Sequence, residues 1–314
     1  MTAFVEPPRL GQRMLAAVLR TSLILFFRSL IRPPMPIAAQ RWIIRVLTAS
    51  TLTPHGVRRV EGTLAGLPCE WHRPVDDSQR VMLYLHGGAY LIGSPATHRA
   101  ITSHLAKRCK LAVCVLDYRL APEHPFPAAL DDGVAAYQAL LAQGYRGEQI
   151  VLAGDSAGGN LALGLALRLQ AADLPLPAAL VCFSPLTDAS LSHLHQPPAG
   201  DPLLSVAWIE QAGALFCPPQ VDRRDPFLSP VYADLSGLPP LLIQVGEDEV
   251  LLNDSLRLAE RATAAGVAVQ LQRYANCWHV FQAHAGLLDV ADLALARVAS
   301  FVQQHCAEPQ HKGP

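Results

Sequence analysis

The sequence has few charged residues and no excess of either sign. Only 16% of its 314 residues are charged, against about 25% in an average soluble domain. Its 25 Lys and Arg nearly balance its 26 Asp and Glu, so no positive field gathers phosphates and a nucleic-acid partner is not expected. Hydrophobic residues make up 51% of the chain, which is enough for a large core and excludes disorder as its main state.

The sequence also lacks the residue spacings of a metal or redox site. Its seven cysteines are scattered and form no C-x-x-C pair, so we expect reduced, buried thiols in a cytoplasmic protein. His193 and His195 lie in a proline-rich stretch without a nearby cluster of Cys or Glu. The sequence therefore predicts neither a metal nor a cofactor.

A long, uninterrupted apolar run is absent as well. Three arginines break the apolar stretch from Leu10 to Ile31, and its longest apolar-dominated piece, Thr21 to Phe27, is far shorter than the ~20 residues of a membrane span. Arg32-Pro33-Pro34 follows where a signal peptide would carry small residues. We expect an amphipathic helix that packs on the body of the protein, with docking on a membrane surface as the less favoured alternative.

From Val57 onward, short β-branched runs alternate with Ala- and Leu-rich helical stretches. This alternation predicts an α/β fold, with a mostly parallel eight-stranded sheet covered by helices on both faces. The expected strands are 57–64, 69–73, 81–85, 111–116, 149–153, 178–183, 241–245 and 267–272, and the expected helices are 96–108, 127–143, 157–170, 251–265 and 287–304.

Two segments do not follow the alternation. One is the N-terminal 50 residues, and the other, at about 186–230, is rich in proline but contains a helical piece with Trp208, Ile209, Ala212 and Leu215 on one face. A long irregular insertion after a strand is usually a lid or a binding loop. We therefore expect a catalytic domain over 51–314, capped by N-terminal helices (1–50) and by the insertion.

The clearest chemical signal is the run Gly154-Asp155-Ser156-Ala157-Gly158-Gly159-Asn160, between an apolar strand and a helical stretch. A serine on such a tight turn has a strained backbone, and the glycines two residues away on each side avoid clashes with the neighbouring strand and helix. The pattern predicts a nucleophile elbow. Ser156 is the expected nucleophile, and the amide of Ala157 can hold an oxyanion at the helix N-terminus.

A second glycine-rich turn, His86-Gly87-Gly88-Ala89-Tyr90, follows the strand at 81–85. Its glycines allow the amides of Gly87 and Gly88 to turn toward a substrate carbonyl oxygen. His86 is expected to hold this loop by hydrogen bonds and not to act as the catalytic base.

A serine nucleophile needs a base and an acid to orient that base. His279 follows the last predicted strand, late in the chain, as the order Ser, acid, His requires. His284 is the alternative, although we expect it on the following helix, pointing away from the site.

The acid must lie between Ser156 and His279, at a strand end. Glu247, Asp248 and Glu249 follow the strand at 241–245. Asp248 is favoured because it lies two residues past Gly246, where the chain turns, and because a short side chain suits the close contact with the imidazole. Glu247 takes its place if the strand ends one residue away from the expected position. Glu249 and Asp254 are expected to belong to the next helix.

These residues resemble the hormone-sensitive lipase family of esterases, the bacterial family IV carboxylesterases. The resemblance rests on His86-Gly87-Gly88-Ala89, on Asp117-Tyr118-Arg119-Leu120-Ala121-Pro122-Glu123, on the Ser156 motif and on the pair Asp248 and His279. It implies an α/β-hydrolase fold under a helical cap, with short-to-medium acyl esters as substrates. It also implies Gly87, Gly88 and Ala157 as oxyanion donors.

The sequence thus predicts a serine carboxylesterase that acts on a small-molecule ester, with Tyr90, Asp155 and Trp208 as further candidates for substrate contact. The same triad could serve an amide, a carbamate or an acetylated sugar, because the pocket walls set specificity. A receptor built on an inactive hydrolase is disfavoured because the triad is intact. The oligomeric state stays open, with a homodimer as one option.

Overall fold

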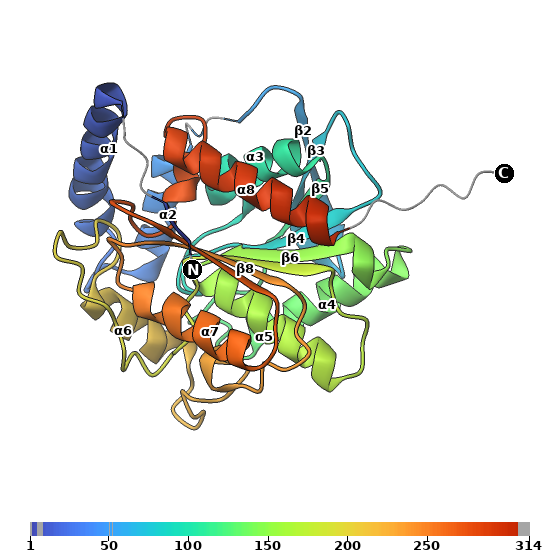
Figure 1. Cartoon of the computed structure of the whole chain (residues 1–314). Coiled ribbons are helices and arrows are strands. Elements are labelled where there is room, and N and C mark those ends of the chain that lie inside the picture. Colours follow the sequence, from blue (N-terminus) through green and yellow to red (C-terminus); the bar gives the residue numbers. More distant parts are fainter. Residues whose placement is uncertain (1, 5–8, 50, 52, 307–314) are drawn as a thin grey trace.

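The computed structural model describes residues 2–4, 9–49, 51 and 53–306. Its centre is one twisted sheet (Figure 1), which has nine strands in the described residues. The strand order is β1-β9-β8-β7-β6-β4-β5-β3-β2. β2 and β3 form an antiparallel hairpin and β3 pairs antiparallel with β5, whereas all other pairs are parallel. The strands are β1 Thr2–Phe4, β2 Val57–Leu64, β3 Leu67–Pro74, β4 Val81–Leu85, β5 Ala112–Leu116, β6 Ile150–Asp155, β7 Ala179–Phe183, β8 Leu241–Gly246 and β9 Val269–Tyr274.

The predicted α/β-hydrolase sheet and its eight strands are confirmed. The ninth strand, β1, lies in the N-terminal segment that we expected to be only helical, and it pairs with β9 at the edge of the sheet. Three residues are too few to produce a recognisable alternation, so the sequence pattern could not indicate this strand.

Helices cover both faces of the sheet, as the continuous apolar strands require. Met82 and Tyr84 of β4 pack in the cluster beneath α3 (Arg99–Cys109) and α8 (Asp289–His305). Leu83 and Leu85 of the same strand point to the other face. That face is covered by α4 (Ala128–Ala142), α5 (Ala157–Ala171) and α7 (Leu252–Ala264).

The remaining longer helices lie together beyond one end of the sheet (Figure 1). They are α1 (Leu10–Ser22), its π-helical continuation η1 (Leu23–Arg28), α2 (Ile37–Leu47) and α6 (Val206–Phe216). Trp208 of α6 donates its indole N–H to Gln40 Oε1 of α2 at 2.9 Å, and both side chains are buried. The N-terminal segment and the insertion therefore meet, although Gln40 and Trp208 are 168 residues apart in the chain. Short 3₁₀ turns occur at η2 (Pro95–His98), η3 (Gly147–Gln149), η4 (Pro230–Tyr232) and η5 (Phe281–His284).

The N-terminal helix is longer and more apolar than its arginines suggested. Leu10–Arg28 forms 19 continuous helical residues, and by length and composition alone it could cross a membrane, a criterion that signal sequences and buried core helices also meet. None of its residues is buried. The expectation of a segment far too short to span is therefore wrong on length, because helical arginines interrupt the apolar run without ending the helix.

Candidate active site

Ser156 stands on a sharp turn between β6 and α5. Its backbone lies at φ 53° and ψ −118°, a strained conformation for a residue with a side chain. A methyl group on Gly154 would collide with the carbonyl of Gly158, and one on Gly158 would collide with the carbonyl of Leu85. The strand, turn and helix predicted for the nucleophile elbow are therefore present, and both glycines are needed for close approach to neighbouring backbone.

Replacing Gly158 with alanine is expected to destabilise the fold by about 1–3 kcal/mol or more, because the new methyl group meets the rigid carbonyls of β4. Gly11 provides a matched control, since it is also the second residue of its helix but a Cβ there has no neighbour within 4 Å. Thermal unfolding should show a clear loss of stability for Gly158→Ala and none for Gly11→Ala. Equal melting temperatures for the two variants would contradict the packing of the elbow.

His279 lies between β9 and η5 and shares a cavity with Ser156. The imidazole is buried, and its Nδ1 lies 3.2 Å from Oε1 of Glu249. Burial lowers the pKa of His279, but the hydrogen bond and the negative charge of Glu249 outweigh it and raise the pKa above its usual value. A histidine held in this way has its other nitrogen available to the cavity.

Glu249 is held by its own set of donors. Its side chain is completely buried, and its Oε2 accepts hydrogen bonds from Ser184 Oγ at 2.6 Å and from the amide of Gly246 at 3.0 Å. A buried carboxylate with two donors and an imidazole partner has its charge compensated. It also has a fixed orientation toward His279.

The expectation that Asp248 lies against the imidazole is therefore wrong. Asp248 Oδ2 is instead 3.3 Å from Arg20 Nη1 of α1, and Glu247 forms an ion pair with Arg273 at 2.8 Å. In the turn after Gly246 it is the third residue, Glu249, and not the second, Asp248, whose side chain folds back to the end of β8 and reaches His279. Val250 and Leu251, which follow Glu249, are buried. This apolar pair is the feature of the sequence that could have indicated that the chain returns to the core directly after Glu249, and that Glu249 is therefore buried.

The glycine-rich loop differs from its prediction by one residue. The amide of Gly87 donates to Asp155 Oδ1 at 3.0 Å, so it is not available as an oxyanion donor, and this expectation is wrong. Gly88 and Ala89 line the cavity, and within the described residues their amides donate no hydrogen bond. Their φ angles, 117° and 53°, turn the chain sharply at this point. Ala89 was missed because a positive φ at alanine leaves no trace in a sequence.

The third expected donor, Ala157, lies where the prediction placed it. It is the first residue of α5, so its amide has no acceptor within the helix. Together, Gly88, Ala89 and Ala157 supply backbone donors on the two turns that flank Ser156.

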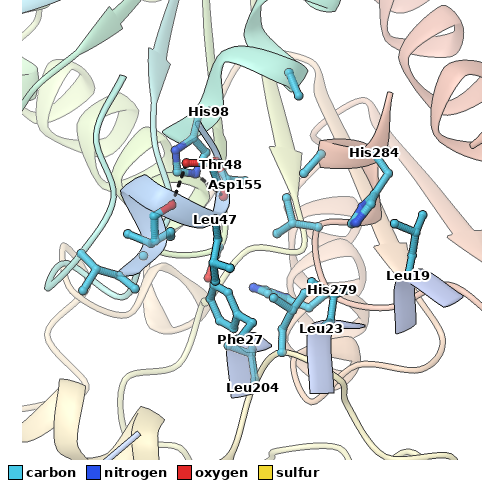
Figure 2. A pocket seen from close by; sticks show the side chains of 18 of the residues that line it. Leu19, Leu23, Phe27, Leu47, Thr48, His98, Asp155, Leu204, His279 and His284 are labelled. Atoms are coloured by element: carbon cyan, nitrogen blue, oxygen red, sulfur yellow. Dashed lines mark hydrogen bonds and ion pairs between the residues drawn. The ribbon is translucent and has the colours of Figure 1, made fainter. Parts of the chain in front are cut away.

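Asp155, which is buried and precedes Ser156 in the chain, pairs with the partly buried His98. Asp155 Oδ1 accepts a hydrogen bond from the Tyr84 hydroxyl at 2.7 Å, and its Oδ2 lies 3.3 Å from His98 Nε2. Figure 2 shows the side chains of Asp155 and His98 next to each other. Burial raises the pKa of Asp155, but the charge and hydrogen bond of His98 prevail and lower it. The same pairing raises the pKa of His98 against its own burial. His98 was missed because nothing in the sequence links the 3₁₀ turn before α3 to the elbow.

Two more histidines lie near the site, and the structure agrees with the expectation for His86 but not with that for His284. His86 Nδ1 contacts the Gly87 carbonyl at 2.9 Å and its ring stacks on Tyr118 at 4.3 Å, which agrees with a role in holding the loop. Burial lowers the pKa of His86 to about 3. His284 does not point away as expected. It lies on η5 and lines the cavity, and burial lowers its pKa to about 4 (Figure 2).

The cavity has a volume of about 450 Å³ and mostly apolar walls. Trp208 and Asp155 line it, as expected for substrate-contacting residues. Tyr90 does not, because its ring stacks on Phe216 at 3.7 Å and its hydroxyl donates to Asn160 Oδ1 at 2.6 Å, so its expected place in the pocket is wrong. Much of the apolar wall comes from α1, η1 and α2, at Leu19, Leu23, Phe26, Phe27, Ile44 and Leu47.

Comparisons with known proteins agree with this arrangement. A family model described as the alpha/beta hydrolase fold matches residues 82–283. An esterase of Acinetobacter venetianus is 40% identical over 240 residues, which cover 76% of this chain and 79% of the relative. An acetyl-hydrolase of Streptomyces hygroscopicus is 40% identical over 249 residues, covering 78% and 83%.

Solved structures give the same result. An esterase from the bacterial hormone-sensitive lipase family superposes with a TM-score of 0.86 at 35% identity, covering 96% of this chain and 100% of that one. A hormone-sensitive lipase from a metagenome library has a TM-score of 0.86 at 37% identity, covering 95% and 100%. The chain belongs to the hormone-sensitive lipase family of α/β-hydrolases, and it is a carboxylic ester hydrolase.

Proposed function

We propose that Ser156, His279 and Glu249 form the catalytic triad. The observation that carries this proposal is the buried contact between Glu249 and His279 at one cavity with Ser156. Ser156 Oγ attacks the ester carbonyl carbon while His279 Nε2 takes its proton and returns it to the departing alcohol. Water, deprotonated by the same imidazole, then attacks the acyl-enzyme and releases the acid and free Ser156. Glu249 keeps Nδ1 protonated and stabilises the imidazolium.

The charge that develops on the substrate oxygen needs donors that are already oriented. We assign this role to the amides of Gly88, Ala89 and Ala157. Asp155 supports them indirectly, since it holds the amide of Gly87 and so fixes the loop, and His98 keeps the Asp155 carboxylate ionised.

The apolar walls support esters with short-to-medium acyl chains as substrates. A volume of about 450 Å³ falls within the range of small-molecule sites. We propose that residues 1–50 and the insertion at about 186–230 act as a cap on the catalytic domain, 51–314, because both supply walls of this cavity. The name of the Streptomyces relative, an acetyl-hydrolase, also favours small acyl groups.

A series of p-nitrophenyl esters of increasing acyl length tests this proposal, with Ser156→Ala as the blank. Leu23→Trp should shift the preference toward shorter chains, because Leu23 lines the cavity. Leu25→Trp is the matched control on the same helix, since Leu25 is 57% exposed and does not line the cavity. An unchanged profile for Leu23→Trp, or an equal shift for both variants, would contradict a wall formed by the N-terminal helix.

We also propose that the enzyme acts in the cytoplasm. All seven cysteines are buried and free, as expected from their spacing. Unpaired thiols are typical of proteins that fold in a reducing compartment.

A further inference from the structure

The outer face of the N-terminal helices carries an unusual share of the exposed apolar surface. Of the fourteen large apolar residues that the described part of the chain exposes, ten lie between residues 10 and 47. On α1 and η1 they recur at helical spacing, and on α2 they are one turn apart. We call this set the apolar face: Leu10, Met14, Val18, Leu25, Trp42 and Val46, which are 52% to 75% exposed.

The opposite side of the same helix is bound to the protein. Arg20 donates to the carbonyl of Ala199 at 2.7 Å and pairs with Asp248, and Arg28 donates to the carbonyl of Asp201 at 2.7 Å. Leu19 and Leu23 line the cavity. These contacts hold the helix along the body of the protein, so that its apolar face is directed outward.

The apolar face continues to the mouth of the cavity. Phe26, Leu47 and Leu287 line the cavity and are also 40% to 54% exposed. These three apolar side chains therefore connect the apolar face to the interior of the cavity, and a ligand that enters along them contacts apolar surface. An apolar ligand that entered this way from an apolar phase would expose little of its own surface to water.

The segment that carries the apolar face has charged residues of only one sign. Residues 9–60 contain nine arginines and no Asp, Glu or Lys, whereas residues 61–314 contain 16 Lys and Arg against 25 Asp and Glu. Arg9, Arg13, Arg32 and Arg45 are exposed and, within the described residues, form no ion pair. Apolar side chains flanked by arginines are typical of helices that lie in the interface of an anionic membrane.

We propose that the apolar face, with Arg9, Arg13, Arg32 and Arg45, docks on an anionic lipid bilayer and holds the mouth of the catalytic cavity against the membrane surface. The docking itself is independent of the triad. Its consequence rests on the proposed function: membrane-partitioned esters reach Ser156 directly from the lipid phase.

Vesicle sedimentation tests the docking with the full-length chain. The protein should pellet with vesicles of phosphatidylcholine and phosphatidylserine, much less with phosphatidylcholine alone, and high salt should release it. Replacing the four arginines with glutamine should weaken binding on the order of 1,000-fold, since each arginine near an anionic surface contributes about 1 kcal/mol. Met14→Ser with Val18→Ser should also weaken binding, whereas Val75→Ser, at an 84% exposed position in the loop after β3, should not.

Tryptophan fluorescence locates the contact. Trp42 is 66% exposed, while Trp71, Trp208 and Trp278 are buried. Anionic vesicles should therefore shift the emission to shorter wavelength in the wild type and leave it unchanged in Trp42→Phe. The variants at Met14, Val18 and Trp42 should hydrolyse soluble p-nitrophenyl acetate at the wild-type rate, because none of these residues lines the cavity.

Three results would overturn the proposal. The first is no binding to phosphatidylserine vesicles by a protein that hydrolyses the soluble ester. The second is binding that resists high salt and survives the arginine substitutions, which would indicate an inserted helix. The third is a dimer, seen by analytical ultracentrifugation without lipid, that Met14→Ser with Val18→Ser dissociates, which would make a second copy the occupant. Loss of hydrolysis with intact vesicle binding would instead contradict the proposed function alone.

Discussion

Replacement of Ser156 with alanine is expected to lower kcat/KM for a p-nitrophenyl ester by ~10⁵ or more. The variant keeps the oxyanion donors and the cavity but has no nucleophile, so that only binding and electrostatic stabilisation remain. The protein should stay folded, because alanine removes only the hydroxyl of a side chain whose neighbours are held by the backbone of the elbow. Steady-state hydrolysis and near-UV circular dichroism measure the two expectations separately.

The partner substitution shows whether the residues act as one unit. His279→Ala should cost about as much as Ser156→Ala, and the double variant should be little worse than either, since a serine without its base is already inactive. His284→Ala is the matched control, as it removes a second histidine from the same cavity. Losses that add in the double variant, or a larger loss at His284 than at His279, would place the base elsewhere.

The second large effect is expected at Glu249. Glu249→Gln keeps the shape of the side chain but removes the charge that stabilises the imidazolium, and it can present an N–H where an acceptor is needed. Turnover should fall by ~10³ to 10⁴. Asp248→Asn and Glu247→Gln are controls in the same turn, and each should cost less than about tenfold, because these carboxylates pair with arginines away from the imidazole.

The pH profile gives an independent measure of the same contact. His279 works as a base only when neutral, so kcat/KM falls as the pH drops through its raised pKa. Glu249→Gln removes the charge of Glu249, which is a main cause of the raised pKa of His279, while the burial that lowers this pKa remains. The acidic limb of the profile should therefore move to lower pH in Glu249→Gln and stay in place in Asp248→Asn. The reverse pattern would restore Asp248 as the acid of the triad.

Sequence patterns predicted the parts of this protein that local chemistry determines. The elbow could be predicted because neighbouring backbone lies so close on both sides of Ser156 that only glycine fits at positions 154 and 158. Two glycines at this spacing around a serine, between a strand and a helix, are therefore typical of such a turn. The strands were predictable for a similar reason, since β4 to β8 are buried on both faces and appear as continuous apolar runs.

The errors arise where side-chain direction depends on contacts distant in the chain. Glu247, Asp248 and Glu249 are chemically alike, and their roles are divided by Arg273, Arg20 and His279, none of which is nearby in sequence. The amide of Gly87 is likewise not free to bind an oxyanion because it donates to Asp155, which is 68 residues away in the chain. Tyr90 is withdrawn from the pocket by Asn160 and Phe216. In each case the deciding partner is brought near only by the tertiary fold.

Covalent labelling tests the central claim most directly. A small phosphonate that reacts with activated serines should add one equivalent to the full-length protein, and peptide mass spectrometry should place the adduct on Ser156. Glu249→Gln and His279→Ala should label far more slowly, and Ser156→Ala should not label at all, while Asp248→Asn should label at nearly the wild-type rate. An adduct on another residue, or equal labelling of Ser156→Ala and the wild type, would contradict the assignment of Ser156 as the nucleophile of this esterase.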